Sequence, residues 1–217
     1  RFRYGCGDYM LRVRFSHGGN LVAMGGPESR GTVCLYSLTS GKVIKLGGLF
    51  SGHKGPVTDL CFSDDDALLA SSGGWGDQKA FVWDCGTGSA KASCSTKTAG
   101  GFRAVHIKNA SSPVLLIAKK SFCTLDIAKD KAEEKPMDAD IQTLSETTAF
   151  SPDGEQFVFQ AGWVSIPQAC RSSDLKPAFP DNSYTLPSIS ACAFSRDGSF
   201  LYYATSENAC RLNTVTG

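Results

Sequence analysis

The sequence predicts an all-β fold built from five copies of one unit. Four segments carry the pair Phe-Ser followed by a turn rich in Asp or Gly, and the intervals between their phenylalanines are 47, 88 and 44 residues. Because 88 is twice 44, a fifth copy is expected midway through the longest interval. Segment 102–129 fills that place, with Ile107 at the aromatic position. The phenylalanines of the other four copies are Phe15, Phe62, Phe150 and Phe194.

Each copy contains several short apolar runs separated by turns. The run that ends at the aromatic position is followed by a turn, a second run such as "ALLAS" or "FLYYA", a loop and a third run such as "AFVW" or "FCTL"; a fourth run is visible in "KVIKL". Such runs, bounded by Gly, Asp, Ser and Pro, are typical of strands. Four strands in roughly 44 residues are typical of one β-propeller blade. We therefore expect at least five four-stranded blades, at about 9–46, 53–95, 98–135, 140–178 and 183–217.

The composition is that of an ordinary globular protein. Hydrophobic residues make up 41% and charged residues 20% of the chain, and the net charge is +1, which gives no global attraction to nucleic acid or acidic membranes. No apolar run approaches the ~20 residues that span a bilayer, and no signal peptide is visible. The nine cysteines form no Cys-x-x-Cys pair and His17, His53 and His106 are far apart, so neither a metal nor a cofactor is expected. Reduced thiols packed as small hydrophobes favour an intracellular, cytoplasmic protein, with a nuclear or organelle-associated assembly as the alternative.

The second copy resembles a WD repeat. It contains Gly52-His53, "PVTDLCFS", "LLAS", Asp77 and Trp83-Asp84, with Asp77 six residues before Trp83. The other copies are degenerate, and we place Tyr36, Leu125, Gln168 and Leu212 at their Trp position. The chain therefore is similar to the WD-repeat β-propeller family, with the match strongest in the second copy.

The resemblance implies a structural tetrad in the second copy. His53, Ser71, Asp77 and Trp83 would form a buried chain of hydrogen bonds that links a loop, the second strand, a turn and the third strand. A catalytic Asp-His-Ser set is the alternative interpretation. It is disfavoured because no nucleophile elbow or oxyanion-hole motif accompanies these residues. No catalytic residue is therefore assigned.

The loops between the second and third strands are three residues longer in the first two copies than in the third and fifth. They read "GGPESRGT" and "SGGWGDQ", and in WD-repeat propellers this face usually receives partners. We therefore predict Glu28, Arg30, Lys54 and Trp75 as candidate partner contacts, because Trp and Arg are favoured interface anchors. The alternative is that Trp75 folds back over its own blade.

The best functional interpretation is a non-enzymatic protein-interaction scaffold within a larger multiprotein assembly, which binds other proteins through propeller loops. The alternatives are a ligand-binding or enzymatic propeller that uses its central channel, and an RNA-contacting subunit of a ribonucleoprotein. The chain begins at Arg1 and ends at the turn "TVTG". Either it is part of a longer ring, usually seven-bladed in this family, or residues 1–8 supply a closing strand.

Overall fold

A computed structural model describes residues 12–26, 32–46, 52–137, 144–161, 167–176, 178, 189–205 and 207–214. Every regular element in these ranges is a β-strand, so the predicted all-β fold is confirmed. The chain divides into two compact units, residues 1–135 and 136–217, which are described separately. The expected closing strand at residues 1–8 lies outside the described residues.

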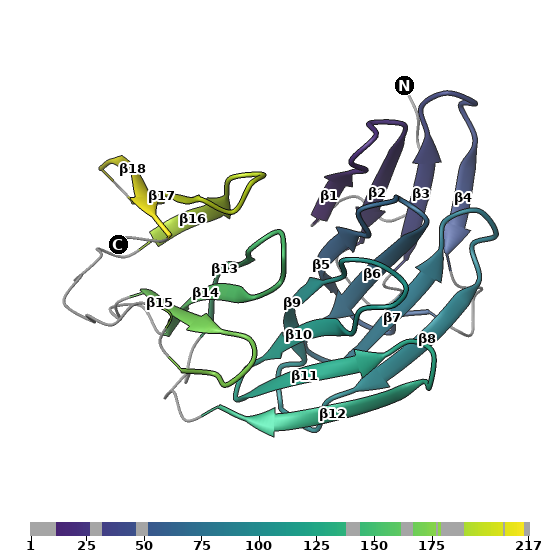
Figure 1. The fold of residues 1–217 in the computed structure, drawn as a ribbon. Helices are drawn as coiled ribbons and strands as arrows, with labels where there is room; N and C mark the ends of the chain where they lie inside the picture. Colours follow the sequence, from purple (N-terminus) through teal and green to yellow (C-terminus); the bar gives the residue numbers. More distant parts are fainter. Residues whose placement is uncertain are drawn as a thin grey trace. The chain divides into compact units, whose positions relative to one another are not determined.

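The N-terminal unit consists of three antiparallel four-stranded meanders (Figure 1). The strands of the first sheet are β1 (Arg12–Phe15), β2 (Leu21–Gly25), β3 (Val33–Ser37) and β4 (Val43–Leu46). Those of the second are β5 (Val57–Phe62), β6 (Leu68–Gly73), β7 (Lys79–Asp84) and β8 (Ala90–Ser95). Those of the third are β9 (Phe102–His106), β10 (Val114–Ala118), β11 (Ser121–Asp126) and β12 (Lys131–Pro136).

The C-terminal unit consists of two antiparallel sheets, each with three strands among the described residues. The fourth sheet contains β13 (Leu144–Phe150), β14 (Gln156–Ala161) and β15 (Pro167–Arg171). The fifth contains β16 (Ile189–Phe194), β17 (Phe200–Thr205) and β18 (Ala209–Asn213). The first strands of these two sheets, β13 and β16, lie next to each other.

The strand registers show where the repeat was read correctly and where it was not. Phe62 pairs with Leu69, which pairs with Trp83. The corresponding third-strand residues in the first, third and fifth sheets are Tyr36, Leu125 and Leu212, as predicted. In the fourth sheet, however, Phe150 pairs with Phe157 and Phe157 pairs with Cys170, so Cys170 occupies the Trp position. The assignment of Gln168 to that position was wrong, because Gln168 pairs with Phe159, two residues further along β14 than Phe157.

Apolar contact between successive sheets forms the core of the N-terminal unit. One cluster joins Ala23, Val33 and Leu35 of the first sheet to second-sheet residues that include Val57, Leu60, Phe62, Leu69, Phe81 and Trp83. A second cluster joins the opposite face of the second sheet to the third sheet and includes Leu68, Ala70, Val82, Val105 and Leu116. Side chains of the second sheet therefore point alternately to its two neighbours, as strand geometry requires.

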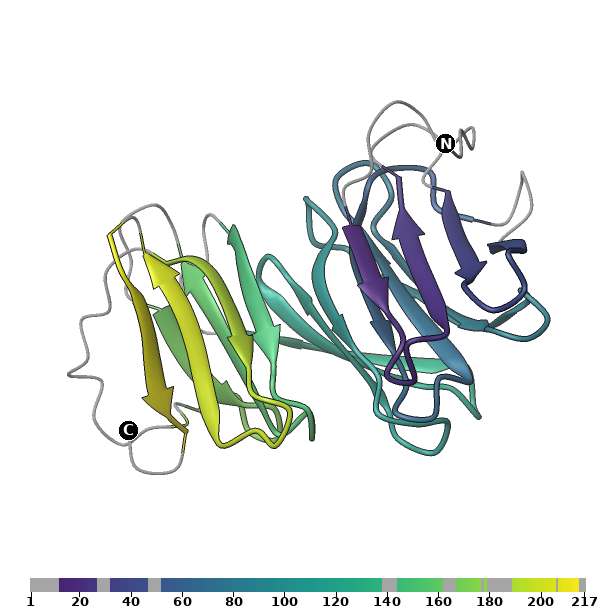
Figure 2. The same ribbon diagram turned by 90° about the horizontal axis from the view of Figure 1, so that it is seen from above.

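Polar contacts join the first strands of these three sheets, which lie side by side (Figure 2). The Arg14 guanidinium lies 3.1 Å from Asp59 Oδ1, and the Val105 amide donates to Asp59 Oδ2 at 3.2 Å. Burial raises the pKa of Asp59, while Arg14 and the backbone donors act in the opposite direction. Thr58 Oγ1 also donates to the Phe102 carbonyl at 2.9 Å. Asp59 and Thr58 thus connect β5 to both neighbouring sheets.

Phe15 and Phe62 occupy the same position in the repeat but have different environments. Phe62 packs against the first sheet and is 3% exposed, whereas Phe15 is 66% exposed. We expect Phe62→Ala to reduce the free energy of unfolding by about 3–5 kcal/mol, because it removes a buried ring and leaves a cavity. Phe15→Ala should cost less than about 1 kcal/mol. Urea unfolding of both variants checks this, and equal losses would contradict the assignment of Phe62 to the inter-sheet core.

Candidate functional site

Two loops of the second sheet meet at one end of the N-terminal unit. Strands of a meander alternate in direction, so the segment that enters β5 and the loop between β6 and β7 lie at the same end of the sheet. The two segments are in contact: a Cβ placed on Gly55 would lie 2.8 Å from the Trp75 carbonyl oxygen. The Gly74 amide also donates to the Pro56 carbonyl at 2.9 Å. We call this end, with its loops 52–56, 74–78, 96–101 and 119–120, the Trp75 end.

A buried chain of hydrogen bonds lies beneath these loops. The Trp83 indole Nε1–H donates to Ser71 Oγ at 2.8 Å, and Ser71 Oγ lies 2.7 Å from His53 Nε2. His53 Nδ1 contacts Asp77 Oδ2, and both of these side chains are 0% exposed. Because Ser71 accepts from Trp83, its hydroxyl can donate to His53 Nε2, which leaves the proton on Nδ1 to be donated to Asp77. The four residues that the resemblance singled out are thus in contact, in the order Trp83, Ser71, His53, Asp77.

Asp77 also holds the backbone of the neighbouring loop. Its Oδ1 accepts from the Lys54 amide at 2.8 Å, so one carboxylate connects segment 52–56 with segment 74–78. Aromatic packing supports the arrangement, because the Phe81 ring contacts the His53 ring edge-to-face at 4.9 Å and stacks on Trp83 at 5.0 Å. The loops of the Trp75 end are therefore fixed to the core of the sheet.

The same geometry weighs against catalysis by the Asp-His-Ser set. With their backbone atoms included, Ser71 is 0% and His53 5% exposed, and the Ser71 oxygen already contacts both Trp83 and His53. A substrate carbonyl could not approach the hydroxyl without displacing the indole, and a nucleophile must be reachable in order to react. The hydrogen bonds of these groups hold the sheet together.

Trp75 lies on the surface of this braced loop. Its side chain is 79% exposed, the largest exposure among the large apolar side chains that the structure describes. The amides of Asp77 and Gln78 both donate to the Gly74 carbonyl at 3.1 Å, which closes a tight turn around Trp75. Gly76 has φ +86°, a conformation that favours glycine. Lys54 is exposed next to this turn, whereas Glu28 and Arg30 lie outside the described residues.

The acidic turn Asp64-Asp65-Asp66 lies at the opposite end and has a role that the sequence did not reveal. Asp66 accepts from the His17 and Gly18 amides at 2.7 Å each, which joins the first turn of the first sheet to that of the second. Although burial raises the pKa of Asp66, the hydrogen bonds from Gly18 and His17 lower it on balance. The sequence carries one signal for this contact, because His17-Gly18 and Asp66 lie in the equivalent turns of the first and second copies.

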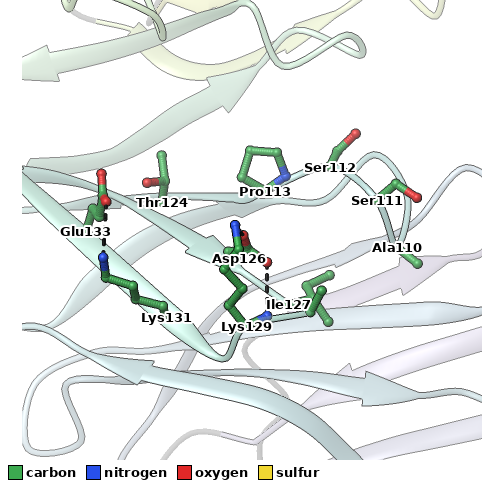
Figure 3. A pocket seen from close by; sticks show the side chains of 11 residues that line it. Ala110, Ser111, Ser112, Pro113, Thr124, Asp126, Ile127, Lys129, Lys131 and Glu133 are labelled. Carbon is green, nitrogen blue, oxygen red and sulfur yellow. Dashed lines mark hydrogen bonds and ion pairs between the residues drawn. The ribbon is translucent and has the colours of Figure 1, made fainter.

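A pocket of about 350 Å³ lies on the third sheet (Figure 3). It is lined by the turn 110–113 and by residues of β11, β12 and the turn between them. Its charges are paired, since Lys129 lies 2.9 Å from Asp126 and Lys131 lies 3.7 Å from Glu133. The pocket therefore presents no unpaired charge to a ligand.

Within the described ranges, no group of three or more His, Cys, Asp or Glu residues is placed to hold a metal ion. The eight described cysteines are free thiols, and burial raises the pKa of Cys61, Cys85, Cys94 and Cys123 to about 12. These four thiols are protonated at neutral pH and are therefore weak nucleophiles. No helix in the described residues is long and apolar enough to cross a membrane.

Three comparisons place the fold among known proteins. The family described as "WD domain, G-beta repeat" matches residues 44–84. WD repeat-containing protein 1 of Bos taurus is 51% identical over 53 residues, which are 24% of this chain and 8% of that protein. The Cps50 (Swd1) β-propeller domain of Myceliophteria thermophila matches with a TM-score of 0.75 at 16% identity, over 98% of this chain and 66% of that one. The chain thus spans a small part of the bovine protein and just under two thirds of the propeller chain.

Consecutive antiparallel meanders with adjacent first strands, matched along 98% of the chain by a propeller domain, define a β-propeller. The match over residues 44–84, which include β5 to β7, shows that the second sheet contains a WD repeat. The resemblance seen in the sequence is confirmed.

The hydrogen-bonded chain should contribute measurably to stability. We expect Ser71→Ala to lower the free energy of unfolding by about 1–3 kcal/mol, because it leaves the Trp83 indole N–H and His53 Nε2 buried without their partner. Ser93→Ala on the exposed side of β8 is the matched control and should change it by less than about 0.5 kcal/mol. Chemical unfolding monitored by circular dichroism measures both. A Ser71→Ala variant as stable as the control would show that the network is dispensable.

Gly73 is required by the network itself. A Cβ at this position would overlap the Asp77 carboxylate and lie 2.7 Å from His53 Nδ1, whereas nothing lies within 4 Å of a Cβ at Gly52. We expect Gly73→Ala to lower the thermal midpoint by several degrees, corresponding to about 2–4 kcal/mol, and Gly52→Ala to leave it nearly unchanged. Scanning calorimetry of the two variants provides the comparison, and similar midpoints would refute the steric argument.

Proposed function

We propose that this chain is a non-enzymatic scaffold that binds a protein partner at the Trp75 end, as part of a larger assembly. The observation that supports the proposal most strongly is the exposed Trp75 on a loop fixed to the core. A large, rigid aromatic side chain contributes much contact area and loses little conformational entropy when a partner covers it. WD-repeat propellers commonly have this role, which supports the scaffold interpretation.

The non-enzymatic part of the proposal rests on chemistry. The acid, base and hydroxyl that come together in the second sheet are buried and bonded to each other. The pocket on the third sheet is lined by paired charges. A central-channel enzyme or ligand site would need a convergent set of accessible polar groups. An RNA-contacting role has less support, because the net charge of the chain is +1.

A single substitution tests the proposal. We expect Trp75→Ala to reduce recovery of at least one co-purifying protein by about tenfold or more, as for an interface hot spot. Because the side chain is exposed, the thermal midpoint should not change. Affinity purification from cell extract followed by quantitative mass spectrometry measures the recovery.

Leu38→Ala is the matched control, since Leu38 is 49% exposed on a turn at the opposite end of the N-terminal unit. It should leave the co-purifying proteins unchanged. Recovery of the same proteins in the same amounts with Trp75→Ala would refute a contact at Trp75.

A further inference from the structure

The Trp75 end has an excess of positive charge. Five lysines lie on or directly beside its loops, and none of them takes part in the ion pairs within 4.0 Å that the described residues form: Lys54, Lys79, Lys97, Lys119 and Lys120. Four of the five are exposed and Lys119 is half-buried. The Arg103 guanidinium adds a further positive charge, since it lies 3.4 Å from the place of a Cβ on Gly100.

Contacts between the loops bring these charges together around Trp75. The Thr96 amide donates to the Gln78 carbonyl at 3.0 Å, and Gln78 Nε2 donates to the Thr98 carbonyl at 3.3 Å. Thr98 Oγ1 lies 3.1 Å from Ser121 Oγ, which follows directly on the Lys119-Lys120 turn. Loops 74–78, 96–101 and 119–120 therefore form one continuous surface, although the lysines are far apart in the sequence.

The described carboxylates at this end are engaged within the protein. Asp77 is buried and contacts His53 and the Lys54 amide. Glu134 Oε1 accepts from the Thr96 hydroxyl at 2.6 Å and the Ser121 hydroxyl at 2.5 Å. Burial raises the pKa of Glu134, but the hydroxyl donors lower it on balance, so this exposed carboxylate stays ionised and accepts hydrogen bonds from neighbouring loops. Two engaged carboxylates therefore face five lysines and an arginine.

The opposite end of the N-terminal unit has the reverse character. Six aspartates lie in its turns or at the strand ends beside them, and these are Asp64, Asp65, Asp66, Asp84, Asp126 and Asp130. Two of its lysines are paired, since Lys91 lies 3.3 Å from Asp84 and Lys129 lies 2.9 Å from Asp126, whereas Lys42 and Lys108 take part in none of the ion pairs that the described residues form. The near-zero net charge of the chain thus conceals a separation of charge between the two ends.

We propose that the Trp75 end binds an acidic segment of a partner protein, with an apolar side chain of that segment against the indole and its carboxylates near the lysines. The inference rests on the proposed function and adds the chemistry of the partner. Complementary charge sets specificity and speeds association, while a desolvated aromatic contact lengthens the lifetime of the complex. The acidic opposite end would repel an extended polyanion such as RNA, which favours a short acidic peptide.

The test uses the whole chain and labelled synthetic peptides. One peptide alternates Glu with Leu, a second replaces each Glu by Gln, and an unlabelled oligothymidylate serves as competitor. In fluorescence anisotropy we expect the Glu peptide to bind about tenfold more tightly than the Gln peptide. The affinity of the Glu peptide should fall severalfold when NaCl is raised from about 0.05 M to about 0.3 M. The Gln peptide should show little salt dependence.

Two charge-reversal variants locate the site. Lys54→Glu/Lys97→Glu/Lys120→Glu should weaken binding of the Glu peptide by about tenfold or more. Lys42→Glu/Lys91→Glu/Lys129→Glu changes the net charge equally at the opposite end and should weaken it less than about twofold. Circular dichroism melting confirms that both variants fold, and Trp75→Ala should weaken the same peptide.

The outcomes separate this inference from the proposed function. Equal binding of the Glu and Gln peptides would overturn the inference, as would equal losses in the two charge-reversal variants. If oligothymidylate displaced the labelled Glu peptide at concentrations as low as those of the peptide itself, the inference would be overturned in favour of a nucleic-acid ligand. Trp75→Ala abolishing co-purification of a partner, with no effect of salt or of the lysine variant, would leave the contact at Trp75 in place and refute an acidic partner.

Discussion

The carboxylate of Asp77 is the interaction on which the arrangement of the Trp75 end depends. One oxygen contacts the His53 imidazole and the other accepts from the Lys54 amide, so two loops distant in sequence share one buried charge. Burying a carboxylate costs free energy unless its oxygens accept hydrogen bonds. If one loop shifted without the other, an oxygen of Asp77 would lose its partner, so the two loops are held together. His53 continues the constraint to Ser71 and Trp83 in the middle of the sheet. Trp75, two residues before Asp77, is held at the surface by contacts beneath it.

This constraint is local to the second sheet. At the position of Ser71, the third sheet has Leu116 and the fourth has Phe159, each 0% exposed. Phe159 stacks on Phe157 at 5.8 Å, so the fourth sheet packs aromatic rings where the second sheet has hydroxyl and imidazole groups. Apolar packing is sufficient to hold a sheet in place and makes no demand on hydrogen-bond geometry. The polar network in the second sheet is therefore explained better by the loops that it fixes than by any need of the fold.

The repeat could be predicted from sequence because its signal is periodic. Strand alternation and turn residues recur at a nearly constant interval, and the strand registers follow from them. The Trp position of the fourth sheet could not be counted, because loop length varies: Cys170 lies 20 residues after Phe150, whereas the interval from Phe62 to Trp83 is 21 residues. Cross-strand pairing with Phe157 decides the position, and no linear count contains that information.

The positive charge around Trp75 was missed for a related reason. Lys97 and Lys120 are 43 and 66 residues after Lys54, and the sequence around each one is unremarkable by itself. They approach one another because equivalent loops of adjacent sheets lie at the same end, as the contacts of Thr96, Thr98 and Ser121 show. A comparison of charge at equivalent repeat positions would have detected part of the pattern, since Lys54 and Lys97 both lie in segments that enter a first strand.

Rigid loops and separated charge are useful together. A field that is positive at one end and negative at the other orients an approaching partner before contact, and its effect weakens as salt screens it. Orientation alone does not make the complex long-lived, because exposed ion pairs contribute little to the free energy of binding. An indole on a loop whose backbone is already fixed can then be covered without the entropy cost of ordering that loop, and the contact persists. The lysines on several loops therefore raise the rate of encounter, while one aromatic side chain on a fixed loop prolongs the complex.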